Sequence, residues 1–286
     1  MQTGNVEGDR RVRVFISADM EGVTGLVAAS ELLPDGPDYP RFRALLTADV
    51  NAAIDGLMQG GAAHLLVCDA HNNSRNILIE SLRPPARLIC GGTKPLGMME
   101  GIDDSFAAAC FVGYHAMFGT HRAIADHTWD PYAVQAVTIN GRGVGEIDLN
   151  AALAGWFGVP VALVTGDDAT ARETADVLPW AERVIVKEEK GRFAADCLLP
   201  EATQALIRDG AANALAHLGR MELWRIAGAT EIAITFFTAG QAERAAWIPS
   251  ADMTAPRVVT CRGADFWEAY RAYRAAVYLG GDVKVF

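Results

Sequence analysis

Short apolar runs alternate with longer amphipathic segments along the first part of the chain. The runs that predict buried strands cover residues 11–19, 64–70, 87–91, 107–114 and 160–168. Residues 39–59 carry apolar side chains at helical spacing up to the Gly60-Gly61 pair, and residues 146–158 predict a second helix. This alternation predicts an α/β fold in which a mainly parallel sheet is covered on both faces, a three-layer α/β/α arrangement.

Residues 136–146 predict a hairpin whose turn is Asn140-Gly141. The pattern of predicted elements changes after Asp168. The elements predicted beyond Asp168 are helices at 168–178, 200–219 and 264–279, and strands at 183–189, 231–238 and 257–263. We therefore predict a metal-binding α/β domain over residues 1–168. A smaller α+β domain is predicted over 169–286, contributing to the cleft and to assembly. Residues 1–10 are polar and predict a frayed tail.

Composition limits the classes of function. The 286 residues are 51% hydrophobic and carry a formal net charge of -10, so a nucleic-acid partner is not expected. No uncharged apolar stretch reaches membrane-spanning length, so we expect no membrane partner. The five cysteines are odd in number and mostly lie in apolar runs, which is typical of free thiols in a reducing compartment. The N-terminus lacks the apolar region of a signal peptide, so a cytoplasmic protein is expected.

Polar side chains follow three of the predicted strands. Asp19 and Glu21 follow the first, His71 the second, and His115 the strand at 107–114. Because open parallel sheets bind ligands beyond the carboxyl ends of their strands, we expect these side chains to lie near one another. Imidazole and carboxylate groups together suit zinc, and two shared carboxylates suit two zinc ions.

Each of these residues alone also has a structural explanation. A carboxylate after a strand is often a helix cap, a single histidine is more often a hydrogen-bonding residue, and Glu146 fits the first turn of a helix. Asp167 and Asp168 fit a helix cap better than a cleft. Lys94 and Lys187 could bind a substrate carboxylate, but this remains the less favoured alternative. A metal site is favoured because carboxylates and histidines occur together at the ends of several strands.

Several motifs resemble those of the D-aminopeptidase family, the M55 metallopeptidases. Residues 17–22, SADMEG, resemble its SxDxEG signature. Similar segments follow in the family's order: CDAHNNSRN at 68–76, KPLGMMEGID at 94–103, FVGYHA at 111–116, the stretch 141–168 beginning GRGVGEIDLN, and VKEEKGRFAADCLLP at 186–200. The resemblance runs from about residue 12 to the C-terminus.

The resemblance implies a role for each site residue. The family binds two zinc ions per chain, and its ligands correspond to Asp19, Glu21, His71, His115 and Glu146, with the aspartate bridging the metals. A catalytic histidine that is not a ligand corresponds best to His127. The segment between His115 and His127 departs from the family pattern, and His121 also lies in it.

The implied activity is zinc-dependent hydrolysis of short peptides with an N-terminal D-residue, by a metal-activated water, in a homo-oligomer that forms a ring. Two alternatives remain at this point. One is a metal-dependent amidohydrolase acting on a non-peptide amide, and the other is a non-catalytic peptide-binding component of a transport system.

Overall fold

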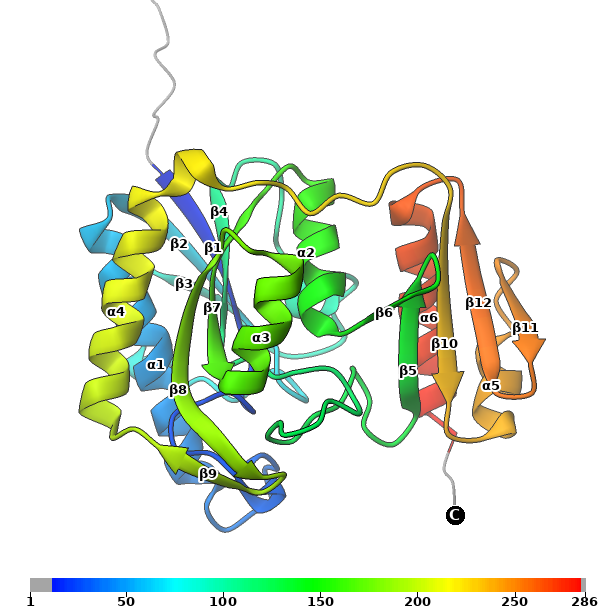
Figure 1. Ribbon diagram of the computed structural model, residues 1–286, viewed down its shortest axis with the longest axis horizontal. Helices are drawn as coiled ribbons and strands as arrows, with labels where there is room; N and C mark the ends of the chain where they lie inside the picture. The colour runs from blue at the N-terminus through cyan, green and yellow to red at the C-terminus, as the bar shows by residue number, and fades with distance from the viewer. Residues whose placement is uncertain (1–11, 284–286) are drawn as a thin grey trace, which may run out of the picture.

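The computed structural model describes residues 12–283, and the tail predicted for residues 1–10 lies outside that range. Two β-sheets organise the chain, with the larger at the left of Figure 1 and the smaller at the right. The larger sheet has the order β3-β2-β1-β4-β7-β8-β9, and all its neighbouring strands are parallel except the final β8–β9 pair. Its strands are β1 (Val12–Ala18), β2 (Ala62–Asp69), β3 (Arg87–Ile89), β4 (Ala108–Val112), β7 (Val161–Asp167), β8 (Glu182–Gly191) and β9 (Ala194–Cys197).

Successive side chains of each strand point to opposite sides of the sheet. Because apolar side chains therefore lie on both faces, helices cover both of them. In β1, Val14 and Ile16 pack in the core formed with α1 (Tyr39–Gln59) and α4 (Pro200–Ala216). Phe15 packs in the other core, with α2 (Glu146–Trp156). The helix α3 (Asp168–Val177) contacts β7 and β8, and lies with α2 on the side of the sheet opposite α1 and α4 (Figure 1). The predicted three-layer α/β/α arrangement is confirmed.

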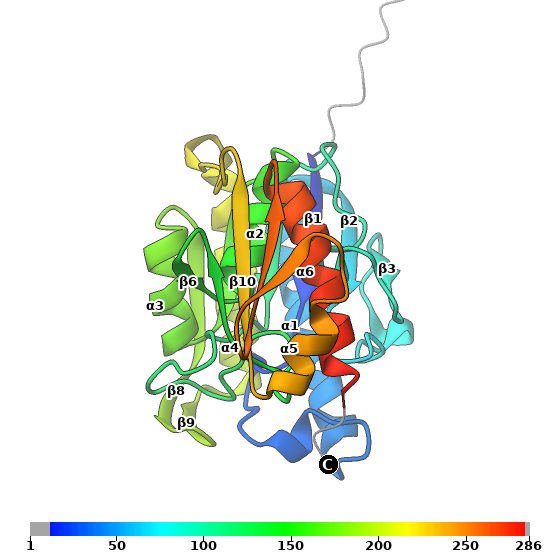
Figure 2. The same cartoon turned by 90° about the vertical axis from the view of Figure 1, so that its right-hand side faces the viewer.

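The smaller sheet is antiparallel and carries its helices on one face. Its order is β11-β12-β10-β5-β6, with strands β5 (Val134–Ile139), β6 (Arg142–Val144), β10 (Thr230–Phe236), β11 (Ala251–Ala255) and β12 (Val258–Gly263). The helix α6 (Phe266–Gly281) packs on β10 and β12, with α5 (Ala239–Ala245) beside it (Figure 2). The predicted hairpin turn is confirmed, because Asn140 and Gly141 join β5 to β6 with φ values of 49° and 83°.

The chain passes between the two sheets more than once. The β5–β6 hairpin precedes residue 168 but belongs to the smaller sheet. Conversely, β8 and β9 follow residue 168 but belong to the larger sheet, and α4, which also follows it, packs on that sheet. One hydrophobic core also joins α2 to α6 and β10, through residues such as Leu153, Tyr273 and Ile234. The boundary predicted at residue 168 therefore does not separate the two sheets, and the division into domains stays a prediction.

Candidate metal centre

The loops after β1, β2 and β4 meet at the carboxyl edge of the larger sheet, because these strands are direct neighbours in the order β2-β1-β4. Backbone hydrogen bonds continue the pairing into the loops: the Asp19 amide donates to the Val112 carbonyl, and the Ala70 amide donates to the Ala18 carbonyl, both at 2.8 Å. Each loop therefore starts from a fixed position. The side chains predicted to gather at this edge do so.

Two glycines bring the loops after β1 and β4 into backbone contact. A Cβ atom on Gly22 would lie 2.0 Å from the Tyr114 carbonyl oxygen, and one on Gly113 would lie 2.3 Å from the Asp19 carbonyl oxygen. Gly113 also has a φ of 74°, which favours glycine. Any side chain at either position would push apart the loops that carry Asp19 and His115.

Asp19 lies between two histidines and directs one carboxylate oxygen to each. Its Oδ1 is 3.3 Å from His71 Nδ1, and its Oδ2 is 3.5 Å from His115 Nε2. A second carboxylate completes each side: Glu21 Oε2 is 3.2 Å from His71 Nδ1, and Glu146 Oε1 is 3.5 Å from His115 Nε2. All five residues are buried. The cluster is thus made of two halves that share Asp19.

The hydrogen bonds of the histidines point their free nitrogens into the cluster. His71 Nε2 lies 3.0 Å from the Leu32 carbonyl, and His115 Nδ1 lies 3.0 Å from the Ala116 carbonyl. Because a carbonyl can only accept, these nitrogens are assigned as the donors, and in the neutral rings His71 Nδ1 and His115 Nε2 keep their lone pairs. A neutral imidazole held in this way is the usual zinc ligand.

The facing atoms fit cations. A lone pair of neutral His71 faces a carboxylate oxygen at 3.2 Å, which is repulsive unless a proton or a cation lies between them. Glu21 Oε2 and His115 Nε2 are buried and make no hydrogen bond within the described chain. With zinc–ligand distances of about 2.0–2.1 Å, two ligand atoms on one tetrahedral ion lie roughly 3.3 Å apart, close to the spacings found here. The residues therefore fit zinc.

The ionisable groups of the cluster shift one another's pKa values. Burial alone would lower the pKa of His71 and of His115, but Glu21 and Glu146 respectively raise both well above the ordinary value. Burial, and then the charge of Glu21, raises the pKa of Asp19 to about 7. Burial opposes ionisation of Glu21 too, yet His71 holds its pKa well below the ordinary value. Without a metal, these shifts place balancing protons on His71 and His115, and bound cations would displace them and leave the neutral rings as ligands.

His127 reaches the cluster from the loop between β4 and β5. Its ring stacks on that of His115, with centroids 4.0 Å apart and an interplanar angle of 13°, and its Nε2 is 3.8 Å from Glu146 Oε1. Its Nδ1 lies 3.0 Å from the Ala125 carbonyl. Burial and the charge of His115 lower its pKa. Its ring could also reach an ion held by His115 and Glu146, so geometry leaves open both a ligand role and a catalytic role.

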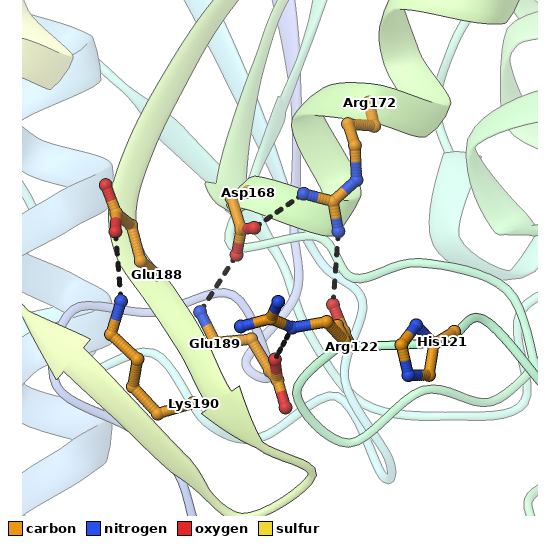
Figure 3. Close-up of a pocket in the computed structure, with 7 residues that line it drawn as sticks. All are labelled: His121, Arg122, Asp168, Arg172, Glu188, Glu189 and Lys190. Atoms are coloured by element: carbon orange, nitrogen blue, oxygen red, sulfur yellow. Dashed lines mark hydrogen bonds and ion pairs between the residues drawn. The ribbon is translucent and has the colours of Figure 1, made fainter.

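A further histidine of this loop, His121, faces a different part of the surface. It is exposed and lies at a hollow of about 410 Å³ whose other side chains pair with one another (Figure 3). Asp168 accepts from Arg172 and from the Glu189 amide, and Arg122 donates to Glu189. This hollow is a charged surface network, separate from the metal cluster.

The cluster opens into a larger cavity of about 820 Å³ between the two sheets. Asp19, Glu21, His71, His127 and Glu146 form one part of its wall. The wall also contains Lys94, Arg192, Phe193, Trp129, Tyr132, Arg274 and Tyr278. A cavity of this size accommodates a small ligand beside the metals.

Both lysines considered as carboxylate-binding groups are engaged by the protein itself. Lys187 is buried and donates to three backbone carbonyls, those of Glu21, Val23 and Leu26. Lys94 lines the cavity, but its ammonium group donates to the Asp69 carbonyl and to Cys68 Sγ. Lys187 therefore anchors the loop that carries Glu21, and neither lysine is the best candidate for substrate binding.

Some supporting residues could not be identified from the sequence. Asn76 holds the loop that carries His71, because its amide group donates to the His71 carbonyl at 2.7 Å and to Asp69 Oδ1 at 2.7 Å. Asp167 caps α3, as its position predicted, but also accepts from the Ile124 amide and so fixes the His127 loop. An asparagine in a polar loop carries no sequence signal of such a role.

Comparison with known proteins identifies the family of this chain. The family model described as Peptidase_M55, D-aminopeptidase, matches residues 12–275. A D-aminopeptidase of Bacillus subtilis (strain 168) is 34% identical over 262 residues, covering 91% of this chain and 95% of that protein. The solved structure of the Zn-dependent D-aminopeptidase DppA from Bacillus subtilis, described as a self-compartmentalizing protease, superposes with a TM-score of 0.92 at 33% identity. This match covers 96% of this chain and 100% of that one.

The fold and the family define a hydrolase that acts on peptide bonds. The chain belongs to the D-aminopeptidase family, M55, as its motifs predicted. The comparisons give no support to the amidohydrolase or to the peptide-binding transport component. Within residues 12–283, no helix is both long and apolar enough to cross a membrane.

Proposed function

We propose that the chain is a zinc-dependent aminopeptidase that removes an N-terminal D-residue from short peptides. Two zinc ions per chain would be held by Asp19, Glu21, His71, His115 and Glu146. The observation that carries the two-metal proposal is the position of Asp19, whose two oxygens face His71 and His115 separately. A carboxylate placed in this way suits a bridge between two ions.

Bound zinc supplies a Lewis acid that lowers the pKa of water and polarises a carbonyl group. The protein's own contribution is to fix the ligands and to carry protons. Glu146 is held by the Trp129 amide, which donates to its Oε1 at 2.6 Å. His127 donates from Nδ1 to the Ala125 carbonyl, so Nε2 is free to accept a proton. Burial and His115 lower its pKa and favour the neutral ring, which is the form a general base needs.

The preference for an N-terminal D-residue rests on the family and on the D-aminopeptidases of Bacillus subtilis that the chain resembles. Short peptides fit a cavity of about 820 Å³. A substrate amine would find negative charge at the acidic end of the cavity, beside Asp19, Glu21 and Glu146.

The chain would work as a homo-oligomer, as a ring that encloses its active sites. This part of the proposal follows the Bacillus subtilis relative, which is described as self-compartmentalizing. A cytoplasmic location is proposed because all five cysteines are free, which suits a reducing compartment.

The proposal is tested by metal analysis together with peptide hydrolysis. Zinc-reconstituted protein should bind about two ions per chain and hydrolyse D-Ala-D-Ala faster than L-Ala-L-Ala, and a chelator should abolish both properties. Equal rates on the two peptides would remove the D-preference. Reproducible binding of a single ion would remove the two-metal site.

A further inference from the structure

A buried arginine from the smaller sheet's helix lines the metal cavity. Arg274, on α6, has only 4% of its surface exposed. Its guanidinium carbon lies 4.0 Å from the ring centre of Trp129 and 4.7 Å from that of Tyr278. Its Nη2 donates to the Tyr278 hydroxyl at 2.9 Å. Both aromatic rings therefore lie against the guanidinium group, and together with the hydrogen bond they restrict its orientation.

The positive charge of Arg274 has no carboxylate partner in the described part of the chain. Its Nε and Nη1 are buried without any hydrogen bond within residues 12–283. No ion pair within 4.0 Å involves it there, although Asp130 and Asp282 line the same cavity. Asp282 pairs with Arg244, and Asp130 Oδ1 accepts from the Tyr132 amide. A buried guanidinium without a counter-charge is costly, so an anionic ligand would stabilise it.

Arg274 is connected to the metal cluster through one residue. The Trp129 amide donates to Glu146, and the Trp129 ring stacks on Arg274. Lys94 is engaged by Asp69 and Cys68, and Arg192 is paired with Asp126. Among the described residues of this wall, Arg274 is therefore the cation without a carboxylate or carbonyl partner. The cavity thus has an acidic, metal-binding part and an unpaired cation elsewhere in its wall. That charge pattern complements a zwitterion with an amine at one end and a carboxylate at the other.

We propose that Arg274 binds the C-terminal carboxylate of the peptide substrate and so selects short peptides with a free C-terminus. This inference rests on the proposed peptidase function, whose substrate class it narrows. A guanidinium presents its N–H groups in a planar fork that matches a carboxylate. Trp129 and Tyr278 orient that fork.

The first test compares a peptide acid with its amide on the zinc-loaded enzyme. D-Ala-D-Ala should have a KM about 10- to 100-fold lower than D-Ala-D-Ala amide, the ratio expected for hydrogen bonds to a charged group, with a smaller change in kcat. Equal KM values for the two peptides would overturn the proposal without affecting the aminopeptidase assignment.

The second test uses Arg274→Met, which keeps an unbranched apolar stem, and Arg274→Lys, which keeps the charge without the fork. Arg274→Met should raise KM for the acid to that for the amide, and Arg274→Lys should recover part of the difference. The matched control is Arg271→Met, because Arg271 lies on the same helix but is exposed. If Arg274→Met fails to fold, the acid-to-amide ratio of the natural enzyme still decides.

A binding measurement separates this proposal from the activity. The probe is the D-Ala-D-Ala analogue in which a methylene-amine replaces the scissile amide, titrated as acid and as amide into the zinc-loaded protein by calorimetry. Tighter binding of the acid, lost in Arg274→Met, supports the role of Arg274 even if no peptide is hydrolysed. Equal binding of acid and amide overturns it even if hydrolysis is fast.

Discussion

Arg192 contacts both the side chain and the main chain of Asp126, and so connects the β8–β9 hairpin to the loop that carries His127. Its Nη1 pairs with Asp126 Oδ1, and its Nη2 donates to the Asp126 carbonyl at 3.0 Å. Asp126 also accepts from the Gly119 amide at 2.6 Å. Although Asp126 is adjacent to His127 in the chain, it orients the loop and not the imidazole.

We therefore predict that Arg192→Gln lowers kcat by about 3- to 10-fold, because a small displacement of His127 is costly for catalysis. Thermal stability should change little, since half of the Arg192 side chain is exposed. Arg122→Gln is the control, because Arg122 lies in the same loop but pairs with Glu189 on the outer surface. Unchanged kcat in Arg192→Gln would show that the hairpin does not position the loop.

His127→Ala should retain zinc and lose turnover by about 10²–10⁴-fold, the usual contribution of a general acid or base. His121→Ala should leave both properties nearly unchanged, because His121 is exposed at the charged hollow. The measurements are zinc content and kcat. Loss of one zinc ion from His127→Ala would make His127 a ligand and would require another proton carrier.

Asp19→Ala should lower zinc content at both positions and abolish hydrolysis. The reason is that Asp19 directs one oxygen to each half of the cluster, whereas Glu21 and Glu146 each serve one half. Glu21→Ala is the informative comparison and should affect one ion more than the other. Full zinc occupancy with near-normal turnover in Asp19→Ala would exclude Asp19 from the site.

Lys187→Met should destabilise the protein, by on the order of 3 kcal/mol, because three buried carbonyls would lose their donor. Zinc content should fall as well, since one of these carbonyls belongs to Glu21. Unfolding by denaturant and metal analysis measure the two effects. Lys190→Met is the matched control on the same strand, because Lys190 is exposed and pairs with Glu188. Retention of normal zinc binding in Lys187→Met would limit its role to stability.

Asp49 should make the protein's stability depend on pH between about 4 and 6. Burial raises its pKa from the ordinary 3.8 to about 6, although hydrogen bonds from Thr24 act in the opposite direction. The folded state therefore binds this proton more tightly than the unfolded state does. As a result, the free energy of unfolding falls as pH rises from 4 to 6, by on the order of 2–3 kcal/mol.

Asp49→Asn should remove that dependence, and the test is the difference in unfolding free energy between the two proteins from pH 4 to 8. The natural protein should lose stability relative to Asp49→Asn as pH rises through this range. A difference that stays constant with pH would show that Asp49 does not titrate as its environment indicates.

Much of the fold follows from sequence periodicity alone. The helix predicted at 39–59 is α1 itself, and the strands expected near residues 11–19, 64–70 and 160–168 are β1, β2 and β7. The short elements β9, α5 and β11 were not predicted, because a few residues carry too little periodicity to distinguish them from loops. The assignment of strands to sheets also could not be predicted, since it depends on pairings between distant segments.

The residues of the candidate site also fall into those that the strand pattern predicted and those that it did not. Asp19, His71 and His115 could be found because strand ends mark the edge where ligands gather. Glu146 and His127 needed the family resemblance, because the first turn of a helix and a loop give no comparable signal. The sequence offered Lys187 only as a possible carboxylate-binding group and did not single out Arg274. The anchoring role of Lys187 and the proposed role of Arg274 depend on partners from other elements, the 21–26 loop for Lys187 and Trp129 for Arg274.

The crossing of the chain between its sheets has a consequence for the order of folding. The β5–β6 hairpin leaves the ribosome before β7, β8 and β9, yet its neighbour β10 follows all of them. A chain emerging from its N-terminus therefore cannot finish either sheet before starting the other, and the open edge of β5 must wait for a distant partner. All the residues proposed to hold the metals have been synthesised once the chain reaches Glu146. Lys187, which secures the Glu21 loop, comes later. The Glu21 loop therefore lacks this anchor until residue 187 of the 286 has been synthesised.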